Sequence, residues 1–567
     1  MLLSFTACLL LFFGVTFGLA WPLAARLALD PAEKLCASVL LSLLGVYLAA
    51  FAIYVFRLPL AAFGVLPLLA AAGLLARLRP LSAVLRDSDA RGLLIGLLLV
   101  TGWCLSWLLL VVSYSGGGWA GDWFEHWERL RFFIERWPYQ AKFLGFNALP
   151  ARPPLANLVT GALLAVPGVS FAGYQLVTTL LNCLVVLPAG LLARRFLPRT
   201  GGGGAAIAVL TVLLMLNPSF VENATFAWTK LIAAFFILAG LYFFLRANDP
   251  GAPASAGPLC AAGLAAGLLA HYSAGPYVVL LAGAWLGLNH ARWRDPAWWR
   301  QTGRLGLIGG LILATWFGWS LAVYGAHTTL FSNSTVAVPE ARQGNQLLKI
   351  ALNLRDTLVP HFLRTLDPAL ITQGSPWGYA RDWFFQLYQV NLLFLVGSVA
   401  WLTLAVRLFR DGRAADARPR GFWLWFAGGA ILLGIAVHGA RDHWGLAHIC
   451  LQAVLVLGLA YLAARWRVLG RGWQLAVAAG AAVDFCLGMA LQFYAQSRTP
   501  DLAFILAGAP AGLPSRYNWS ADMNLAGKLL HGLAFFGDVV AVPAWFVPVL
   551  LAGLLGLALR RLRALPE

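Results

Sequence analysis

The stretch NPSFVENATFAWTKLIAAFFILAGLYFFL, residues 217 to 245, decides the fold class of this chain. From Thr225 onward it is an apolar run long enough to cross a hydrocarbon core of about 30 Å. Lys230 stands near the start of this run and is one of only five lysines in 567 residues. Because an ionisable group inside a span is a functional hypothesis by default, the stretch that predicts a membrane helix also predicts a site.

Apolar runs of this kind recur along the whole chain. Hydrophobic residues make up 60% of the sequence and charged residues 11%, with a mean hydropathy of +0.76, well above the values of an average soluble domain. We therefore expect an all-α, polytopic membrane protein with about 15 transmembrane helices and amphipathic periplasmic loop helices. The predicted spans cover residues 5–25, 35–56, 59–77, 92–112, 171–193, 204–217, 225–245, 258–270, 275–290, 303–325, 388–407, 421–437, 446–463, 473–491 and 541–559. The short ones, such as 258–270, are expected to be broken helices or helices that stop beneath a cavity.

The formal net charge of +18 does not indicate a nucleic-acid-binding protein. The arginines lie in short clusters between apolar runs, as positive-inside topology signals do, so we expect these clusters to face the cytoplasm. They occupy residues 77–91, 194–199, 292–304, 407–420, 465–471 and 560–563. The seven cysteines lack metal-ligand spacing and are expected to pack as small apolar residues. No basic residue precedes Arg26, so the first apolar run is interpreted as a retained span rather than a signal peptide.

Placing every basic cluster on one side divides the chain into five segments. Eight of the nine histidines then fall on or near the outer side, so the ionisable groups that chemistry needs are concentrated there. The expected location is the inner (plasma) membrane, with the active face periplasmic or extracellular. The segments are N-terminal transmembrane helices (1–112), a first outer loop (113–170), a central transmembrane core (171–325), a second outer loop (326–387), and C-terminal helices (388–567) that include an outer loop at 492–540.

The first outer loop contains the most polar stretch of the chain, GGGWAGDWFEHWERLRFFIERWP, residues 116 to 138. Asp122, Glu125, His126 and Arg129 follow at i, i+3, i+4 and i+7, which places them on one stripe of a helix. We expect an amphipathic helix on the outer membrane surface whose acids and histidine point into a cavity. An N-cap at Asp122 with an acid three residues later would by itself account for both carboxylates. We favour catalysis over capping alone for Asp122, and local salt bridges for Glu125, Glu128 and Arg129.

Further along the same loop, PARPPLANLVTGALLAVPG (150–168) places Arg152 beside two prolines. Pro153 and Pro154 are good helix starters, so helix initiation alone accounts for them. Arg152 is a candidate ligand for a phosphate group.

Together these residues resemble the first outer loop of the GT-C membrane glycosyltransferases, in particular the protein O-mannosyltransferase and aminoarabinose-transferase branch. The similar features are an acid after a span, an amphipathic loop helix and then RPPL. The similarity continues into residues 217–245 and into LLAHYSAGPYVVLLAGAWLGL, residues 268–288. This chain departs from the branch in two ways, with three spans before the acidic loop and GDWFEH in place of an adjacent acid pair.

The resemblance implies transfer of a sugar from a polyprenyl-phosphate donor to an acceptor hydroxyl on a lipid, glycan or protein, at the outer face. A carboxylate in a partly dry cavity suits the general base, and cations must stabilise the leaving phosphate. The catalytic candidates are Asp122, then His126, then Glu125. The donor-phosphate candidates are Lys230, Arg152, Arg441, His443 and His448, and the cavity-lining candidates are His271, Tyr272 and Glu222.

Each of these roles has a structural alternative. Lys230 could instead reach the interface or pair with Glu222. A packing histidine at a helix end is the simpler interpretation of His271. No closed metal-ligand set is present, so we expect no required cofactor, with a divalent cation as an open alternative.

Two other functions stay open. An O-antigen ligase or polymerase using polyprenyl-pyrophosphate is motivated by the outer-loop arginines Arg342, Arg355, Arg364 and Arg381. A lipid or sugar transporter would need charges in the middle of several spans, and Asp484 is nearly the only deep one.

Overall fold

The computed structural model describes residues 2–111, 121–197, 203–333, 345–358, 420–437, 451–490 and 546–564, with a few single positions between 376 and 410. In these residues the ordered elements are helices, joined by turns and by one isolated bridge between Phe143 and Asn147. Eight helices are long and apolar enough to cross a membrane, or up to ten if each bent pair counts as one span. The predicted all-α, multi-pass membrane fold is therefore confirmed. The predicted count of about 15 spans includes ranges outside the described residues and stays a prediction.

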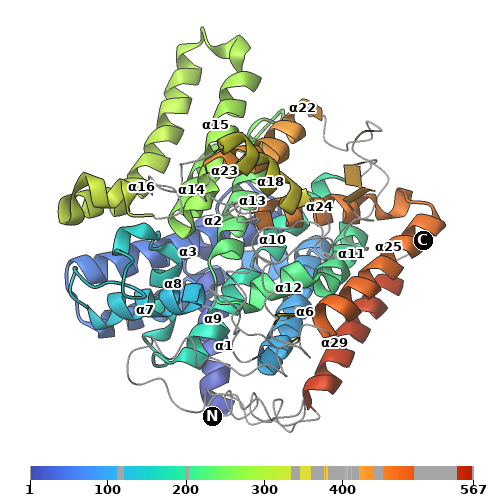
Figure 1. The fold of residues 1–567 in the computed structure, drawn as a ribbon, viewed down its shortest axis with the longest axis horizontal. Coiled ribbons are helices and arrows are strands. Elements are labelled where there is room, and N and C mark those ends of the chain that lie inside the picture. Colours follow the sequence, from blue (N-terminus) through green and yellow to red (C-terminus); the bar gives the residue numbers. More distant parts are fainter. Residues whose placement is uncertain are drawn as a thin grey trace.

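The helices follow one another along the chain as labelled in Figure 1. Their bounds are α1 (Leu2–Gly18), α2 (Trp21–Ala24), α3 (Pro31–Val55), η1 (Leu60–Gly64), α4 (Val65–Ala76), α5 (Leu78–Arg86), α6 (Ser88–Val111), α7 (Gly121–Glu135), η3 (Leu149–Ala151), α8 (Leu155–Leu164), α9 (Phe171–Cys183), α10 (Val186–Arg195), α11 (Gly203–Leu216), α12 (Pro218–Thr225), α13 (Lys230–Ala247), α14 (Ala256–Ala270), η4 (Tyr272–Ala274), α15 (Gly275–Leu288), η5 (His290–Arg292), α16 (Pro296–Phe331), α18 (Gln346–Leu358), α22 (Arg420–Trp423), η9 (Leu424–Gly428), α23 (Gly429–Val437), α24 (Leu451–Arg465), η10 (Trp466–Val468), α25 (Arg471–Asp484), η11 (Phe485–Ala490) and α29 (Phe546–Arg563).

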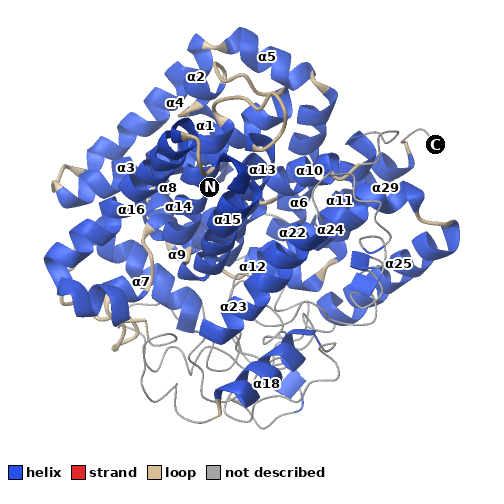
Figure 2. Cartoon of the chain, turned by 90° about the horizontal axis from the view of Figure 1, so that it is seen from above, coloured by secondary structure: helices blue, strands red, loops and turns tan. Residues whose placement is uncertain are grey.

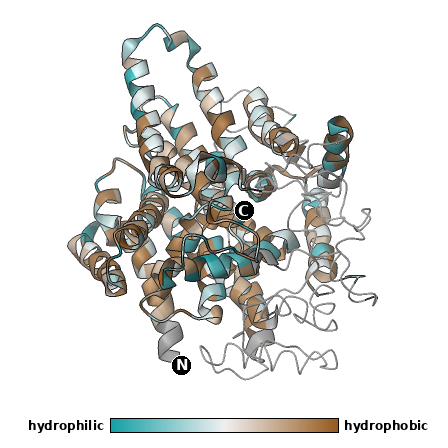
Figure 3. Cartoon of the chain, turned by 60° about the vertical axis from the view of Figure 1, so that its left-hand side comes forward, coloured by the Kyte–Doolittle hydropathy of each residue, from teal (hydrophilic) through white to brown (hydrophobic). Residues whose placement is uncertain are grey.

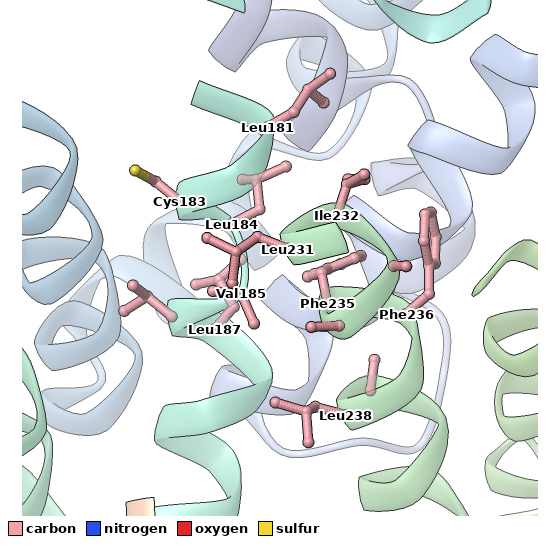
Figure 4. Packing of buried hydrophobic residues seen from close by; sticks show 14 of the residues in the cluster. Leu181, Cys183, Leu184, Val185, Leu187, Leu231, Ile232, Phe235, Phe236 and Leu238 are labelled. Atoms are coloured by element: carbon pink, nitrogen blue, oxygen red, sulfur yellow. The ribbon is translucent and has the colours of Figure 1, made fainter. Parts of the chain in front are cut away.

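Helix α13 lies at the centre of the bundle, and its residues from Lys230 to Leu245 are buried. Such burial is expected of a helix that is apolar on every side. Figure 4 shows its side chains, such as Leu231 and Phe235, meeting Leu184 and Leu187 from the α9–α10 segment. The stretch that predicted the fold class therefore forms the core around which the other helices pack.

Two glycines bring α13 and α14 into close contact. A Cβ atom added to Gly263 would lie 3.2 Å from the Phe236 carbonyl oxygen and 3.3 Å from Gly240 Cα. A Cβ added to Gly240 would lie 2.9 Å from the Leu264 side chain. Small residues at a helix crossing allow backbones to approach closely, which is a common basis of helix association in membranes.

Several of the predicted spans are interrupted. The predicted span 204–217 corresponds to α11, which continues into α12 after a bend of 74° at Asn217. Asn217 caps α12 by accepting a hydrogen bond from the Phe220 backbone N–H at 2.9 Å. The predicted span 225–245 begins only at Lys230 in the structure, because residues 226–229 form a turn. The short predicted span 258–270 is α14, which ends at Ala270 just before His271.

The helix ends gather on two opposite faces. On one, which we call the ion-pair face, Glu33 at the start of α3 accepts hydrogen bonds from Tyr242 (2.7 Å) and Arg246 (3.0 Å) near the end of α13. The same face carries two further ion pairs, Arg195–Asp249 and Arg194–Asp89. Sixteen residues of helix separate Lys230 from Arg246, or roughly 24 Å, so the start of α13 lies on the other face, together with α7. We call this second face the α7 face.

The remaining helices flank this core. Figure 1 shows α15 and α16 projecting as a hairpin, and Figure 3 shows hydrophilic residues at its tip. Helix α29 packs against α6 and α11, so the end of the described chain returns to its first third. Figure 2 shows α18 and α23 at the edge of the bundle.

Candidate active site

Helix α7 provides the acidic side of the candidate site. It begins at Gly121, as the predicted helical pattern from Asp122 requires. The side chain of Asp122 lies outside the described residues. Glu125, His126 and Arg129 are buried to at least 98%, and α7 packs against α8. The helix is therefore enclosed by protein along this part, whereas the sequence predicted a helix lying on the membrane surface.

Glu125 and Arg129 form the local ion pair that their i, i+4 spacing predicted. Glu125 Oε1 accepts hydrogen bonds from Arg129 Nη2 at 2.6 Å and Nε at 2.9 Å. Arg129 also donates to the carbonyl oxygens of Leu149 (2.6 Å) and Ala148 (3.0 Å). Burial alone would raise the pKa of Glu125, but the charges of Arg129 and Arg152 outweigh it and hold the pKa at about 2. Glu125 is therefore a carboxylate at neutral pH, and α7 is fixed to the segment that leads to Arg152.

Arg152 approaches the same carboxylate from the other side. Its Nε lies 3.4 Å from Glu125 Oε2, and its side chain is 17% exposed. Arg152 ends η3 and precedes Pro153 and Pro154, after which α8 begins at Leu155. The two arginines thus place two positive charges around one buried carboxylate.

His126 faces away from this ion pair toward α8. Its Nδ1 lies 3.1 Å from Asn157 Oδ1, while its Nε2 is buried and has no hydrogen-bond partner among the described residues. Burial lowers the pKa of His126 to about 3, against the opposing effect of Glu125 and with the added effect of Arg152 and Arg129. The imidazole is therefore neutral, and an acceptor amide oxygen at Asn157 fixes the proton on Nδ1.

Lys230 enters the site from the start of α13. It is fully buried, and its Nζ lies 4.0 Å from the centre of the Trp228 ring. The Trp228 ring in turn lies 6.0 Å from the His271 ring, centre to centre, in an edge-to-face arrangement. The turn at 226–229 and the end of α14 therefore bring a lysine and a histidine into contact with one tryptophan.

His271 and Tyr272 follow the end of α14. His271 Nδ1 accepts a hydrogen bond from the Ser273 backbone N–H at 3.1 Å, so in the neutral imidazole the proton is on Nε2. That Nε2 is buried and has no partner among the described residues. Tyr272 donates to the Pro150 carbonyl oxygen at 3.1 Å, which joins this turn to the loop that carries Arg152.

Glu222 lies on the short helix α12 that precedes the same turn. It is fully buried, and its backbone carbonyl accepts a hydrogen bond from Phe226 N–H at 2.8 Å. The neighbouring Asn223 accepts a hydrogen bond from Gln452 at 2.9 Å, which ties α12 to α24. Glu222 is thus placed on the segment that ends in Lys230.

The α7 face accordingly brings together most of the residues that the sequence singled out for a site. Glu125, His126, Arg152, Lys230, His271 and Tyr272 come from four separate segments of the chain, and Arg152, His126 and Lys230 all act electrostatically on His271. Arg441, His443 and His448 lie outside the described residues. No group of three or more His, Cys, Asp or Glu side chains in the described part of the chain could hold a metal ion.

Three residues that border this site, Asn157, Trp228 and Thr229, were not predicted from the sequence. Asn157 is one polar residue in an apolar run, and only the fold shows that it meets His126. Trp228 and Thr229 immediately precede Lys230 at the start of a helix. Their position beside this lysine was the only sequence signal for them.

Comparisons with known proteins identify similar structures. No protein-family model matches the chain, and no curated protein matches it. Two crystal structures of ArnT from Cupriavidus metallidurans are similar to it. The one bound to undecaprenyl phosphate has a TM-score of 0.48 and 16% identity, with 84% of this chain and 76% of that chain covered. The apo structure has a TM-score of 0.46 and 16% identity, with 82% and 74% covered. ArnT is a GT-C aminoarabinose transferase, a branch that the sequence motifs resemble. An identity of 16% transfers no residue role, so the roles below rest on this chain's own contacts.

Proposed function

We propose that this protein is a GT-C-like membrane glycosyltransferase that moves a sugar from a polyprenyl-phosphate donor to an acceptor hydroxyl. The observation that carries the proposal is the cluster in which the buried Lys230 and His271 and the partly buried Arg152 lie near the acid-bearing helix α7. Cationic side chains that converge in a low-dielectric site attract an anion more strongly than they would in water. A donor phosphate is an anion of the right kind for a membrane-embedded site of this composition.

The cations suit the leaving group of such a reaction. As the acceptor oxygen bonds to the anomeric carbon, the bond between that carbon and the phosphate oxygen breaks, and the phosphate leaves with the electron pair. Lys230 and Arg152 would stabilise the negative charge that develops there, and the Nε2–H of His271 would donate a hydrogen bond. Because the site is buried, these interactions are stronger than they would be in water.

The general base in this proposal is Asp122. Glu125 already accepts hydrogen bonds from Arg129, and its pKa of about 2 makes it a weak base. The pKa of about 3 for His126 has the same consequence. Efficient general bases have a pKa near the working pH. Asp122 is the remaining acid of the α7 stripe, and we propose that it takes the acceptor proton.

Location and partners follow from the same proposal. The ion-pair face carries Arg194 and Arg195, and Asp89 of the segment 77–91 pairs with Arg194 there. Basic residues on this face support a cytoplasmic location for it by the positive-inside rule. The α7 face would then be periplasmic or extracellular, and its substrates would be an undecaprenyl-type lipid carrier and a lipid, glycan or protein acceptor.

Transfer of label from a panel of radiolabelled polyprenyl-phosphate sugars to membrane acceptors tests this function. We expect wild type to transfer from at least one donor, and Asp122→Asn at matched expression to lose transfer. We expect Lys230→Gln to lose about 10²-fold or more, the usual effect of removing one donor to a developing oxyanion. Lys142→Gln is the matched control. Lys142 is an exposed lysine of the first outer loop, so this variant should retain full activity.

Two outcomes would contradict the proposal. Full transfer activity in Asp122→Asn would show that Asp122 is not the general base. Transfer from polyprenyl-pyrophosphate donors alone would favour the ligase or polymerase alternative, in which the outer-loop arginines bind the additional phosphate.

A further inference from the structure

A small buried cavity lies between His126 and the turn that carries Lys230. It has room for about one water molecule. It is bordered by α7, α8, α9 and the turn at 226–229, and its polar lining includes His126, Asn157, Thr178, Asn182 and Thr229. Most of these side chains are bonded elsewhere, so the question is which polar atoms the cavity leaves without a partner.

His126 and Thr229 each leave a buried polar atom without a partner in the described part of the chain. These atoms are His126 Nε2 and Thr229 Oγ1, and the two residues are 2% and 5% exposed. The bond from His126 to Asn157 Oδ1 places the ring proton on Nδ1, so Nε2 presents a lone pair. Thr229 occupies the N-cap position of α13, yet its side chain makes no capping hydrogen bond.

A single water molecule in the cavity that both residues line would satisfy both atoms. It can donate to His126 Nε2 and bond with the Thr229 hydroxyl, which meets the requirement of at least two polar partners for a buried water. Leaving the two atoms unbonded would cost the desolvation penalty of each. Tyr174 already holds the turn by donating to the Ala227 carbonyl oxygen at 3.0 Å, and such a water would add a second attachment at Thr229.

We propose that this cavity holds one ordered water that joins His126 to Thr229, and that both side chains are positioning residues for Lys230. The water fixes the residue directly before Lys230, and therefore the direction in which α13 presents its ammonium group. His126 acts through the water and takes no proton from substrate. The role assigned to Lys230 rests on the proposed function, whereas the water and the coupling it creates do not.

A double-mutant cycle on thermal unfolding in detergent tests the water without any activity assay. The variants are Thr229→Val, which removes the hydroxyl at nearly constant volume, and His126→Leu. We expect Thr229→Val to lower the melting temperature of wild type but not that of His126→Leu, since the water is already lost there. Thr178→Val is the matched control, because Thr178 lines the same cavity but already donates its hydroxyl to the Tyr174 carbonyl oxygen at 2.8 Å. Its effect should be the same in both backgrounds. Equal effects of Thr229→Val in both backgrounds would overturn the proposal.

Donor kinetics test the positioning role. Thr229→Val should raise the KM for the polyprenyl-phosphate sugar about three- to tenfold, the effect of one lost neutral hydrogen bond, with kcat nearly unchanged. Thr229→Ser should restore the wild-type KM. If the effect of Thr229→Val on the melting temperature depends on His126 but the donor KM of Thr229→Val equals that of wild type, the positioning role would be overturned. A wild type that transfers nothing would contradict the proposed function alone, because the melting cycle still decides whether the water is present.

Discussion

Replacing Glu125 by glutamine tests the central contact of the site. Glu125 is 99% or more buried and bonds to Arg129 and Arg152, and its pKa is about 2 against an ordinary value of 4.5. A shift of that size corresponds to about 3 kcal/mol of stabilisation of the ionised form. The variant leaves the Arg129 guanidinium buried beside a neutral amide. Removing one partner of a buried ion pair in this way lowers the free energy of unfolding by about 3–5 kcal/mol. We therefore expect Glu125→Gln to lower the free energy of unfolding by about 3 kcal/mol or more.

The same helix provides a matched control. Arg131 and Glu135 form an ion pair with the same i, i+4 spacing at 2.7 Å, but their side chains are 33% and 40% exposed. Exposed pairs contribute less than about 1 kcal/mol, so Glu135→Gln should change the unfolding midpoint of the detergent-purified protein only slightly. Tryptophan fluorescence follows the transition.

The pH dependence has a defined sign. The folded-state pKa of Glu125 lies below its unfolded value, so the stabilisation is fully present above about pH 4.5 and is lost as the pH falls toward 2. The difference between wild type and Glu125→Gln should therefore be constant between about pH 5 and 8 and shrink in acid. Equal midpoints for Glu125→Gln and Glu135→Gln would refute the reasoning, because they would show that the buried pair is not formed in the folded protein.

Three further predictions concern packing and polar contacts elsewhere. Gly263→Val should lower the free energy of unfolding by about 1–3 kcal/mol, the cost of overpacking, because the added carbons would meet the Phe236 carbonyl oxygen. Gly306→Val is the control and should leave the unfolding midpoint unchanged, because a Cβ added there would have no atom within 4 Å. Tyr242→Phe should cost about 1.5–3 kcal/mol in the same assay, since the hydroxyl donates to the Glu33 carboxylate at 2.7 Å; a midpoint equal to that of wild type would contradict this. Trp228→Leu removes the ring 4.0 Å from Lys230 Nζ. Donor KM should therefore rise about thirtyfold, which corresponds to the loss of about 2 kcal/mol from a desolvated cation–π contact. Trp293→Leu, at an exposed position, should leave the donor KM unchanged.

The features that sequence predicted well are those set by short-range spacing. The helix at Asp122, the Glu125–Arg129 pair and the early end of the segment at 258–270 all depend on residues within two turns of one another. The apolar runs likewise predicted the fold class, because hydrocarbon thickness imposes a minimum length on each span.

Contacts between distant segments could not be predicted from the sequence. The partner of His126 is Asn157, 31 residues away, and no periodicity connects the two. The burial of α7 was also missed, because an amphipathic pattern has the same period whether the apolar stripe faces lipid or protein. The bend of 74° at Asn217 had a local signal, an N-cap residue followed by Pro218, but such a signal predicts a helix start without giving its direction.

The interruptions of the helices explain why the site lies where it does. Backbone that is not helical at membrane depth is tolerated only where it is buried in protein or lines a cavity. Lys230 directly follows the turn between α12 and α13, and His271 directly follows the end of α14. Trp228 belongs to the first turn and contacts both Lys230 and His271, and the Tyr272 hydroxyl joins the second turn to the loop that carries Arg152. Two separate breaks that meet at one tryptophan, each followed by an ionisable residue, have no purpose in packing alone, since an unbroken apolar helix would satisfy its backbone at lower cost. The breaks allow side chains from separate helix ends to converge at one place, and this is why the proposed function places the donor phosphate between them.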